Sequence, residues 1–179
     1  MSRTSAAPVD RFLAELSERR AQLDDCLVDS TTADEVAWTL CEFAGRELEL
    51  DDCVVYLALD QGRALAQRAA WGAKRVAERV LDAPIRLNLS QGVVGTCALV
   101  GAPQLIADTR LDARYLRDDA RRLSELAVPM RAPGVVLGVI DTEHAQPDAF
   151  DSRHVRALLA IAEAGVARLL SLEKKPAGA

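Results

Sequence analysis

The sequence has few aromatic side chains and no long apolar run. Aromatic residues make up 4% of the 179 residues, so we expect a core of Leu, Val, Ile and Ala, and a cavity lined by stacked rings is disfavoured. A run of about 18 apolar residues, which a membrane-spanning helix needs, does not occur, and the first residues lack the apolar region of an export signal. We therefore expect a cytoplasmic protein without a membrane partner.

The sequence also lacks an excess of positive charge and a metal-binding motif. The formal net charge is −5, which disfavours nucleic acid as a partner. The cysteines form no Cys-x-x-Cys pair, and neither His144 nor His154 lies at ligand spacing from them, so we predict no metal site. We assign neither histidine a catalytic role. Buried packing as reduced thiols is the favoured interpretation of all four cysteines: Cys26, Cys41, Cys53 and Cys97.

The remaining composition is that of one packed domain. Hydrophobic residues account for 50% and charged residues for 27% of the chain, which excludes wholesale disorder. The pattern divides the chain into a helical arm over residues 1–29, a domain over 30–172 and a disordered tail over 173–179.

Two amphipathic helices are predicted at the start of the chain and one at its end. Apolar residues recur at helical spacing between Val9 and Leu27 and form a narrow seam that is typical of coiled coils. A second helix follows the cap-rich break at 29–32 and ends near Glu49. Asp151 and Ser152 begin a long terminal helix with a broad apolar stripe. The seam consists of Phe12, Leu16, Leu23 and Leu27.

Strand patterns occupy the middle of the chain. Residues 53–59 are apolar on both alternating faces, which indicates a central strand covered on each side. A turn at 60–63 leads into a second strand near 64–71, and residues 72–83 are irregular. The sequence then predicts a strand near 85–89, a short helix at 93–100, a strand at 104–107 and a polar loop at 109–122.

The clearest local prediction is a hairpin. Residues 125–130 and 135–140 are two strands joined around Pro133 and Gly134, which suit a type II turn. Antiparallel strands with helices at both sequence ends predict an α+β domain whose sheet carries helices.

Several of these segments, in this order and spacing, resemble the GAF domain family over about residues 30–172. The matching segments are 92–96 (GVVGT), 106–108 (IAD), 114–115 (RY), 124–130 (SELAVPM), 138–144 (GVIDTEH) and Phe150 before the last helix. The resemblance implies an antiparallel sheet of five to six strands with the N- and C-terminal helices on one face. On the other face it implies a small-molecule pocket under loops and short helices.

The resemblance also implies a homodimer through the terminal helices, which suits the seam and the C-terminal helix. The resemblance does not identify a cofactor. The cyclic-nucleotide motif and the bilin-binding cysteine that some family members carry are absent from this sequence.

The strongest candidates for a functional site are three acidic residues, Glu125, Asp141 and Glu143. With a two-residue turn and no bulge, Leu126 pairs with Asp141, and Glu125 then lies on the opposite face of the sheet. A bulge, for which Pro129 is a candidate, places all three carboxylates on one face. They would then raise one another's pKa and attract a cationic or amine-bearing ligand. The alternative is that they are polar strand ends in contact with water.

Four further residues of the middle region are candidates for contact with a ligand in this pocket. Tyr115, beside Arg114 in the polar loop, either closes over the ligand or anchors the loop. For Trp71 core packing is the favoured alternative. The complete set of predicted ligand-binding residues is Trp71, Leu89, Val94, Tyr115, Glu125, Asp141 and Glu143.

One enzymatic branch of the family, the free methionine-R-sulfoxide reductases, has a similar acidic cluster together with reactive cysteines. Alignment on the Gly-rich turn and the Ser-Glu motif places Pro84, Val94 and Asp118 where that branch has its cysteines. Sulfoxide reduction needs a thiolate nucleophile and a resolving thiol, so the reductase interpretation is disfavoured and no catalytic residue is assigned. The nearby Cys97 is interpreted as packing.

Three functions follow in order of preference. The first is a dimeric, small-molecule-sensing signalling module. The second is a small enzyme on the same scaffold with an amino-acid-like substrate. The third is a dimerisation scaffold without a ligand.

Overall fold

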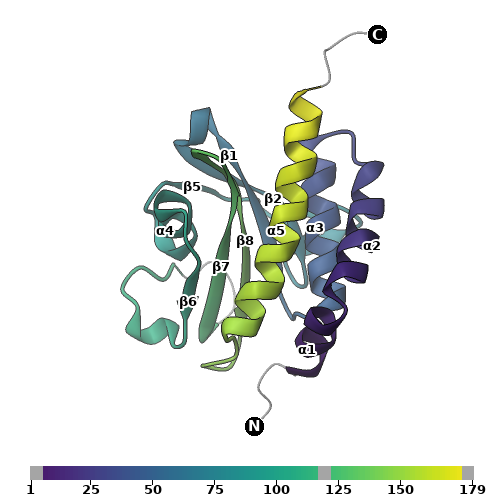
Figure 1. Cartoon of the computed structure of the whole chain (residues 1–179). Helices are drawn as coiled ribbons and strands as arrows, with labels where there is room; N and C mark the ends of the chain where they lie inside the picture. Colours follow the sequence, from purple (N-terminus) through teal and green to yellow (C-terminus); the bar gives the residue numbers. More distant parts are fainter. Residues whose placement is uncertain (1–5, 117–121, 175–179) are drawn as a thin grey trace.

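Six antiparallel strands form a sheet in the order β5-β2-β1-β8-β7-β6 (Figure 1). The structure is a computed structural model that describes residues 6–116 and 122–174. The strands of this sheet are β1 (Cys53–Leu59), β2 (Ala64–Trp71), β5 (Arg86–Asn88), β6 (Gln104–Ile106), β7 (Ser124–Ala132) and β8 (Val135–His144). A separate hairpin consists of β3 (Arg75–Ala77) and β4 (Val80–Leu81), and short 3-10 turns lie at Asp60–Gly62 and Thr109–Leu111.

Helices cover both faces of the sheet. The long helices α3 (Ala33–Glu47) and α5 (Ser152–Glu173) pack on one face, and α4 (Gly92–Val100) packs on the other, as Figure 1 shows. The two N-terminal helices, α1 (Ala6–Ala14) and α2 (Leu16–Val28), pack against α3 and α5 rather than against the strands. This is the α+β architecture that the sequence predicts, with six strands.

Local sequence signals explain where the two main helices begin. The Thr32 side chain accepts a hydrogen bond from the Glu35 amide, and the Glu35 side chain accepts one from the Thr32 amide, which is a capping box. Asp151 caps α5 by accepting from the amides of Arg153 and His154. Each cap satisfies amides that a helix start leaves without an intrahelical partner.

The N-terminal helical segment differs from its prediction in two ways. It is two helices, because the backbone leaves helical geometry at Glu15 (φ −104°, ψ 23°). The seam also packs inside its own chain: Phe12, Leu23 and Leu27 are at most 3% exposed and belong to the core shared with α3 and α5. These three residues are therefore not a surface for a second copy, and only Leu16 of the predicted seam is exposed.

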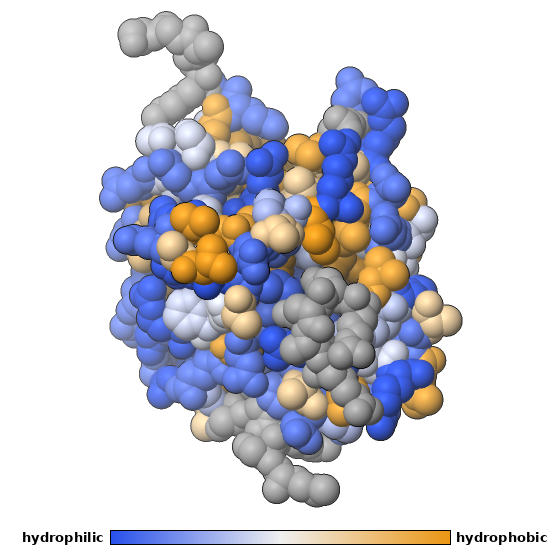
Figure 2. Space-filling view, turned by 180° about the vertical axis from the view of Figure 1, so that it is seen from behind, coloured by the Kyte–Doolittle hydropathy of each residue, from blue (hydrophilic) through white to orange (hydrophobic). Residues whose placement is uncertain are grey.

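Each half of the core lies on one side of the sheet. Successive side chains of a strand point to opposite faces, so Cys53, Val55 and Leu57 face the long helices while Val54 and Tyr56 face α4. Both sets are buried, as predicted for a strand that is covered on each side. On the surface seen in Figure 2, hydrophilic residues surround separate hydrophobic areas.

Two bulges set which residues reach the α4 face. In β2, Val55 pairs with Ala69 and Tyr56 pairs with Gln67, so Arg68 is an extra residue. In β8, Met130 pairs with Gly138 and Arg131 pairs with Val136. A bulge shifts every following side chain to the other face.

The predicted tail overlaps the end of the last helix. The predicted tail at 173–179 begins within α5, and its last five residues lie outside the described part of the chain. Among the described residues, no helix is both long enough and apolar enough to cross a bilayer.

Candidate functional site

Three buried carboxyl groups lie together on the α4 face of the sheet. The extra residue in β8 is Leu137, and beyond it Glu125 pairs with Glu143 and Ala127 pairs with Asp141. The three acidic side chains are between 3% and 5% exposed. The one-residue shift that the sequence left open therefore occurs, although Pro129 pairs in register with Val139 and is not the bulge.

A small cavity of about 40 Å³ lies in front of these carboxyl groups. Tyr56 of β1 and Leu87 of β5 contribute to its floor, and the first turn of α4 and Leu116 cover it. A water molecule needs roughly 10–15 Å³ of such space, so the cavity has room for water but not for a larger ligand in this conformation.

Two oxygens in this cavity have no donor. Glu125 Oε2 and Asp141 Oδ1 are both buried without a hydrogen-bond partner from another group. The two carboxyls interact electrostatically, because the charge of Glu125 raises the pKa of Asp141. A buried pair of this kind retains a proton or takes up a cation.

Burial changes the protonation of the acids. The pKa of Glu125 is raised to about 8, mainly by the loss of solvent and next by the charge of Glu143. Burial is also the main cause that raises the pKa of Asp141 well above its ordinary value, followed by the charges of Glu125 and Glu143. At neutral pH the cluster therefore holds at least one proton.

Lys74 is the cation of the site, and it is not among the residues predicted from the sequence. Its Nζ lies 3.5 Å from Glu143 Oε2, and its side chain is 10% exposed. The charge of Lys74 lowers the pKa of both Glu125 and Asp141 and so opposes the effect of burial. One signal was available: Lys74 is the only lysine before Lys174 in a chain that otherwise uses arginine.

A second ion pair lies beside the cluster. Arg122 Nη2 is 3.7 Å from Oδ2 of the fully buried Asp52. The charge of Asp52 contributes to the raised pKa of Asp141, so Arg122 offsets negative charge that would otherwise add to the cluster.

The other four predicted ligand-binding residues lie in four different places. Val94 lines the cavity with the three acids, whereas Leu89 borders a different hollow at the far end of α4. Tyr115 is half-buried in the loop, and its neighbour Leu116 lines the cavity. Trp71 packs with the long helices, in line with the alternative that the sequence favoured for it, and its Nε1 donates to Leu50 O at 3.0 Å.

The bulge in β2 explains the position of Trp71. Leu65 faces α4, and strict alternation from it would place Trp71 on the same face. Because Arg68 is an extra residue, Ala69 and Trp71 turn to the helix-covered face instead.

The cysteines are all free thiols, and three of the four are buried. Cys97 packs behind the cavity, and burial followed by the charges of Asp141 and Glu125 raises the pKa of its thiol. Cys26 is exposed on α2, against the prediction that every cysteine is packed. Asp118, one of the three positions aligned with reductase cysteines, lies outside the described residues, while Pro84 and Val94 lie within them.

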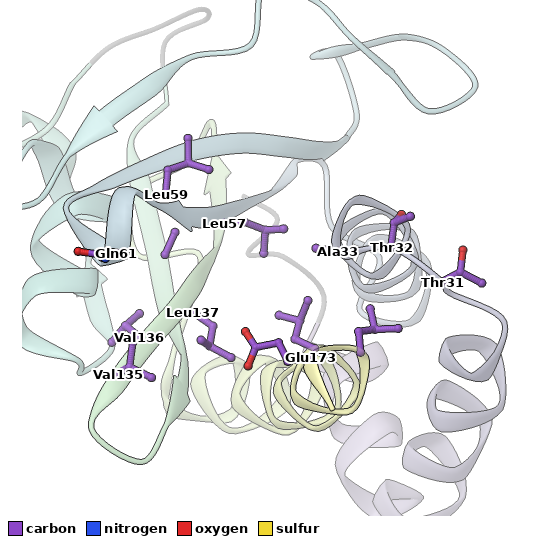
Figure 3. Close-up of a pocket in the computed structure, with 14 residues that line it drawn as sticks. Thr31, Thr32, Ala33, Leu57, Leu59, Gln61, Val135, Val136, Leu137 and Glu173 are labelled. Carbon is purple, nitrogen blue, oxygen red and sulfur yellow. The ribbon is translucent and has the colours of Figure 1, made fainter. Parts of the chain in front are cut away.

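A larger hollow of about 670 Å³ lies at the other end of the sheet. Figure 3 shows Leu57 of β1, Leu137 of β8 and Ala33 of α3 around it. None of the predicted site residues lines it, and its lining includes the carboxylate of Glu173. Within residues 6–116 and 122–174, no group of three His, Cys, Asp or Glu side chains is arranged to hold a metal ion.

Comparison with known proteins agrees with this architecture. The GAF domain family matches residues 30–167. Protein YtsP of Bacillus subtilis (strain 168) is 30% identical over 83 residues, which are 46% of this chain and 51% of that protein. The match thus spans about half the length of this curated relative.

Two solved structures are similar in fold. The free methionine-R-sulfoxide reductase from Neisseria meningitidis in complex with its substrate superposes with a TM-score of 0.74 at 18% identity, covering 88% of this chain and 90% of that one. The GAF domain of a phosphoenolpyruvate-protein phosphotransferase from Coxiella burnetii gives 0.74 at 15% identity and covers 89% and 95%. On the family match and the shared fold, this chain belongs to the GAF domain family.

Proposed function

We propose that the chain is a small-molecule sensor whose ligand carries a protonated amine and binds at the carboxyl groups of Glu125, Asp141 and Glu143. One observation carries the proposal. Three acids that are almost fully buried line one cavity, and two of their oxygens have no donor. Burying unpaired acids costs free energy, and a ligand ammonium would supply the missing donors.

The proposal also includes signalling as a cytoplasmic homodimer. Since most of the predicted seam is internal, a second copy would have to use exposed positions such as Leu16 and the outer side of α5. The partner that receives the signal would be another protein.

A thermal-shift and calorimetric screen tests the ligand class. Primary amines and amino acids should stabilise the protein, whereas alcohols and carboxylic acids of the same length should not. A ligand at 100 times its Kd stabilises by about 2.7 kcal/mol. The variant Asp141→Asn should lose the response, and Glu163→Asn, a change at an exposed position on α5, should keep it.

The reductase remains a second candidate because of the carboxyl cluster and the similarity to the Neisseria meningitidis enzyme. The residues at two of the aligned cysteine positions, Pro84 and Val94, have no thiol. Turnover of free methionine sulfoxide with a thiol reductant, abolished by Cys97→Ser, would favour the enzyme over the sensor.

The scaffold without a ligand is the third candidate, and the small volume of the cavity supports it. It would be favoured if no compound of the screen shifts the unfolding temperature.

A further inference from the structure

Lys74 occupies the cation position of the acidic cavity. It lines the cavity together with the three acids, and its ammonium is paired with Glu143 at 3.5 Å. A lysine ammonium and the ammonium of a small amine present the same charge and the same donors. A ligand with a protonated amine would therefore meet a site in which Lys74 already neutralises part of the negative charge of the carboxyl groups.

The segment that carries Lys74 is a small structural unit of its own. Residues 72–83 form the β3–β4 hairpin, which is hydrogen-bonded at its base from the Asp82 amide to Lys74 O at 3.0 Å. It is not part of the six-stranded sheet. Gly72 begins the segment at φ +92°, where a Cβ would lie 2.4 Å from Asp51 O, and Ala83 ends it at φ +42°.

The outer attachment of the hairpin is ionic. Glu42 of α3 accepts hydrogen bonds from Arg75 Nη1 and Arg79 Nη2, both at 3.1 Å. The Arg75 guanidinium also lies 5.8 Å from the ring centroid of Trp38. Leu81 is a half-buried apolar anchor between the two cores. Isolated two-stranded hairpins are only marginally stable, so the hairpin depends on these contacts.

We propose that Lys74 is an internal competitor of the ligand: its ammonium closes the acidic cavity, and an amine-bearing ligand binds when Lys74 and the start of the hairpin move aside. This inference rests on the proposed function. The volume of the closed cavity supports it, because 40 Å³ accommodates water but not an alkylammonium beside Lys74.

The competition lowers the apparent affinity of the site and makes it selective. A ligand must displace an ammonium that is tethered to the site, so the apparent Kd is the intrinsic Kd divided by the fraction of open molecules. A neutral molecule supplies no charge to replace that of Lys74, and the site therefore rejects it.

Calorimetric titration with n-butylammonium chloride tests the inference, with n-butanol as the neutral control. We expect Lys74→Met to bind n-butylammonium about tenfold or more tightly than the unaltered chain. Glu42→Gln weakens the attachment of the hairpin without touching the cavity and should tighten binding by about two- to fivefold. Asp34→Asn is the matched control, since Asp34 lies on the same helix and pairs with Arg68 of β2.

Lysine-selective NMR supplies a second readout. The chain has three lysines, so a sample labelled at lysine Cε and Nζ gives three signals. The Lys74 signal should be protected from exchange in the free protein and should lose that protection as n-butylammonium is added. This readout does not require the Lys74→Met variant to fold.

The outcomes separate the two proposals. If n-butylammonium binds the unaltered chain and Lys74→Met equally well and the Lys74 signal does not change, the proposal that Lys74 competes with the ligand is refuted. The proposed function as an amine sensor is then retained. If n-butylammonium binds neither the unaltered chain nor Lys74→Met nor Glu42→Gln, the amine-binding function is refuted and the competitor with it.

Discussion

Glu125 and Glu143 are direct cross-strand partners on β7 and β8, and both are buried on the face that α4 covers. Like charges placed opposite one another destabilise a sheet. Two features reduce this repulsion. The ammonium of Lys74 pairs with Glu143, and the raised pKa values of Glu125 and Asp141 favour a proton on one of these two carboxyls. An arrangement that is costly for folding is typical of a functional site.

The raised pKa of Glu125 predicts a fall in stability with rising pH. The folded pKa of about 8 exceeds the ordinary value of 4.5, so the folded state binds the proton more tightly between these values. This contribution is present below pH 4.5, declines as the pH rises and is lost above pH 8. For one proton the slope is at most about 1.4 kcal/mol per pH unit.

Urea unfolding between pH 5 and pH 9 of the unaltered chain and of Glu125→Gln measures this effect. As the pH rises, the free energy of unfolding of the variant should increase relative to that of the unaltered chain, because the amide does not ionise. Glu163→Gln, an exposed acid on α5, should follow the unaltered chain. Parallel curves for Glu125→Gln and the unaltered chain would contradict the prediction. Lys74, Glu143, Asp141 and Asp112 act on the same carboxyl and are kept unchanged.

Gly138, next to the bulge in β8, leaves no room for a side chain. A Cβ at this position would lie 2.3 Å from Tyr56 O, which is backbone. We expect Gly138→Ala to destabilise the fold by about 1–3 kcal/mol and to weaken any ligand response, because β8 positions two of the three acids. Urea unfolding and the thermal-shift screen measure these effects.

The control for Gly138→Ala is Gly134→Asn in the hairpin turn. Gly134 has φ +78° and no atom within 4 Å of a Cβ, and asparagine tolerates this backbone conformation better than other side chains. The variant should cost less than Gly138→Ala. Equal losses would contradict the conclusion that the close approach to Tyr56 O makes Gly138 the more sensitive position.

The sequence predicted the elements well because their signals are local. The alternation over 53–59, the caps at Thr32 and Asp151 and the Pro133-Gly134 turn each act over a few residues, and the structure confirms the strand, helices and hairpin they predict.

The site was harder to predict because long-range packing determines it. The extra residues Arg68 and Leu137 carry no local signal of a bulge, yet they decide that Trp71 leaves the α4 face and that Glu125 joins Asp141. The pair of Lys74 and Glu143 joins residues 69 positions apart in the chain. Only the rarity of lysine in the sequence could have directed attention to it.

The internal position of the helical seam changes the test for a homodimer. Leu23 is 1% exposed, so Leu23→Glu buries an unpaired charge and should cost roughly 3–5 kcal/mol or prevent folding. Leu16 is 36% exposed, and Leu16→Glu should change stability by no more than about 0.5 kcal/mol. Urea unfolding of both variants checks this difference.

Light scattering on the folded Leu16→Glu variant then reports on the dimer. If a homodimer uses the exposed side of the helical layer near Leu16, the mass should fall to that of one chain. A folded, stable Leu23→Glu protein would contradict the internal packing of the seam.

The exposure of the cysteines predicts how the thiols react. A thiol reagent should modify Cys26 quickly in the folded protein, and the other three cysteines should react only after unfolding because they are buried. The fast phase should therefore correspond to about one thiol in four and should disappear in Cys26→Ser, whereas Cys97→Ser should retain it. Cys26 lies on α2, which packs on α3 and α5 on the side of the sheet opposite the acidic cavity. A fast phase that survives in Cys26→Ser and disappears in Cys97→Ser would place a reactive thiol behind the acids and would favour the enzyme over the sensor.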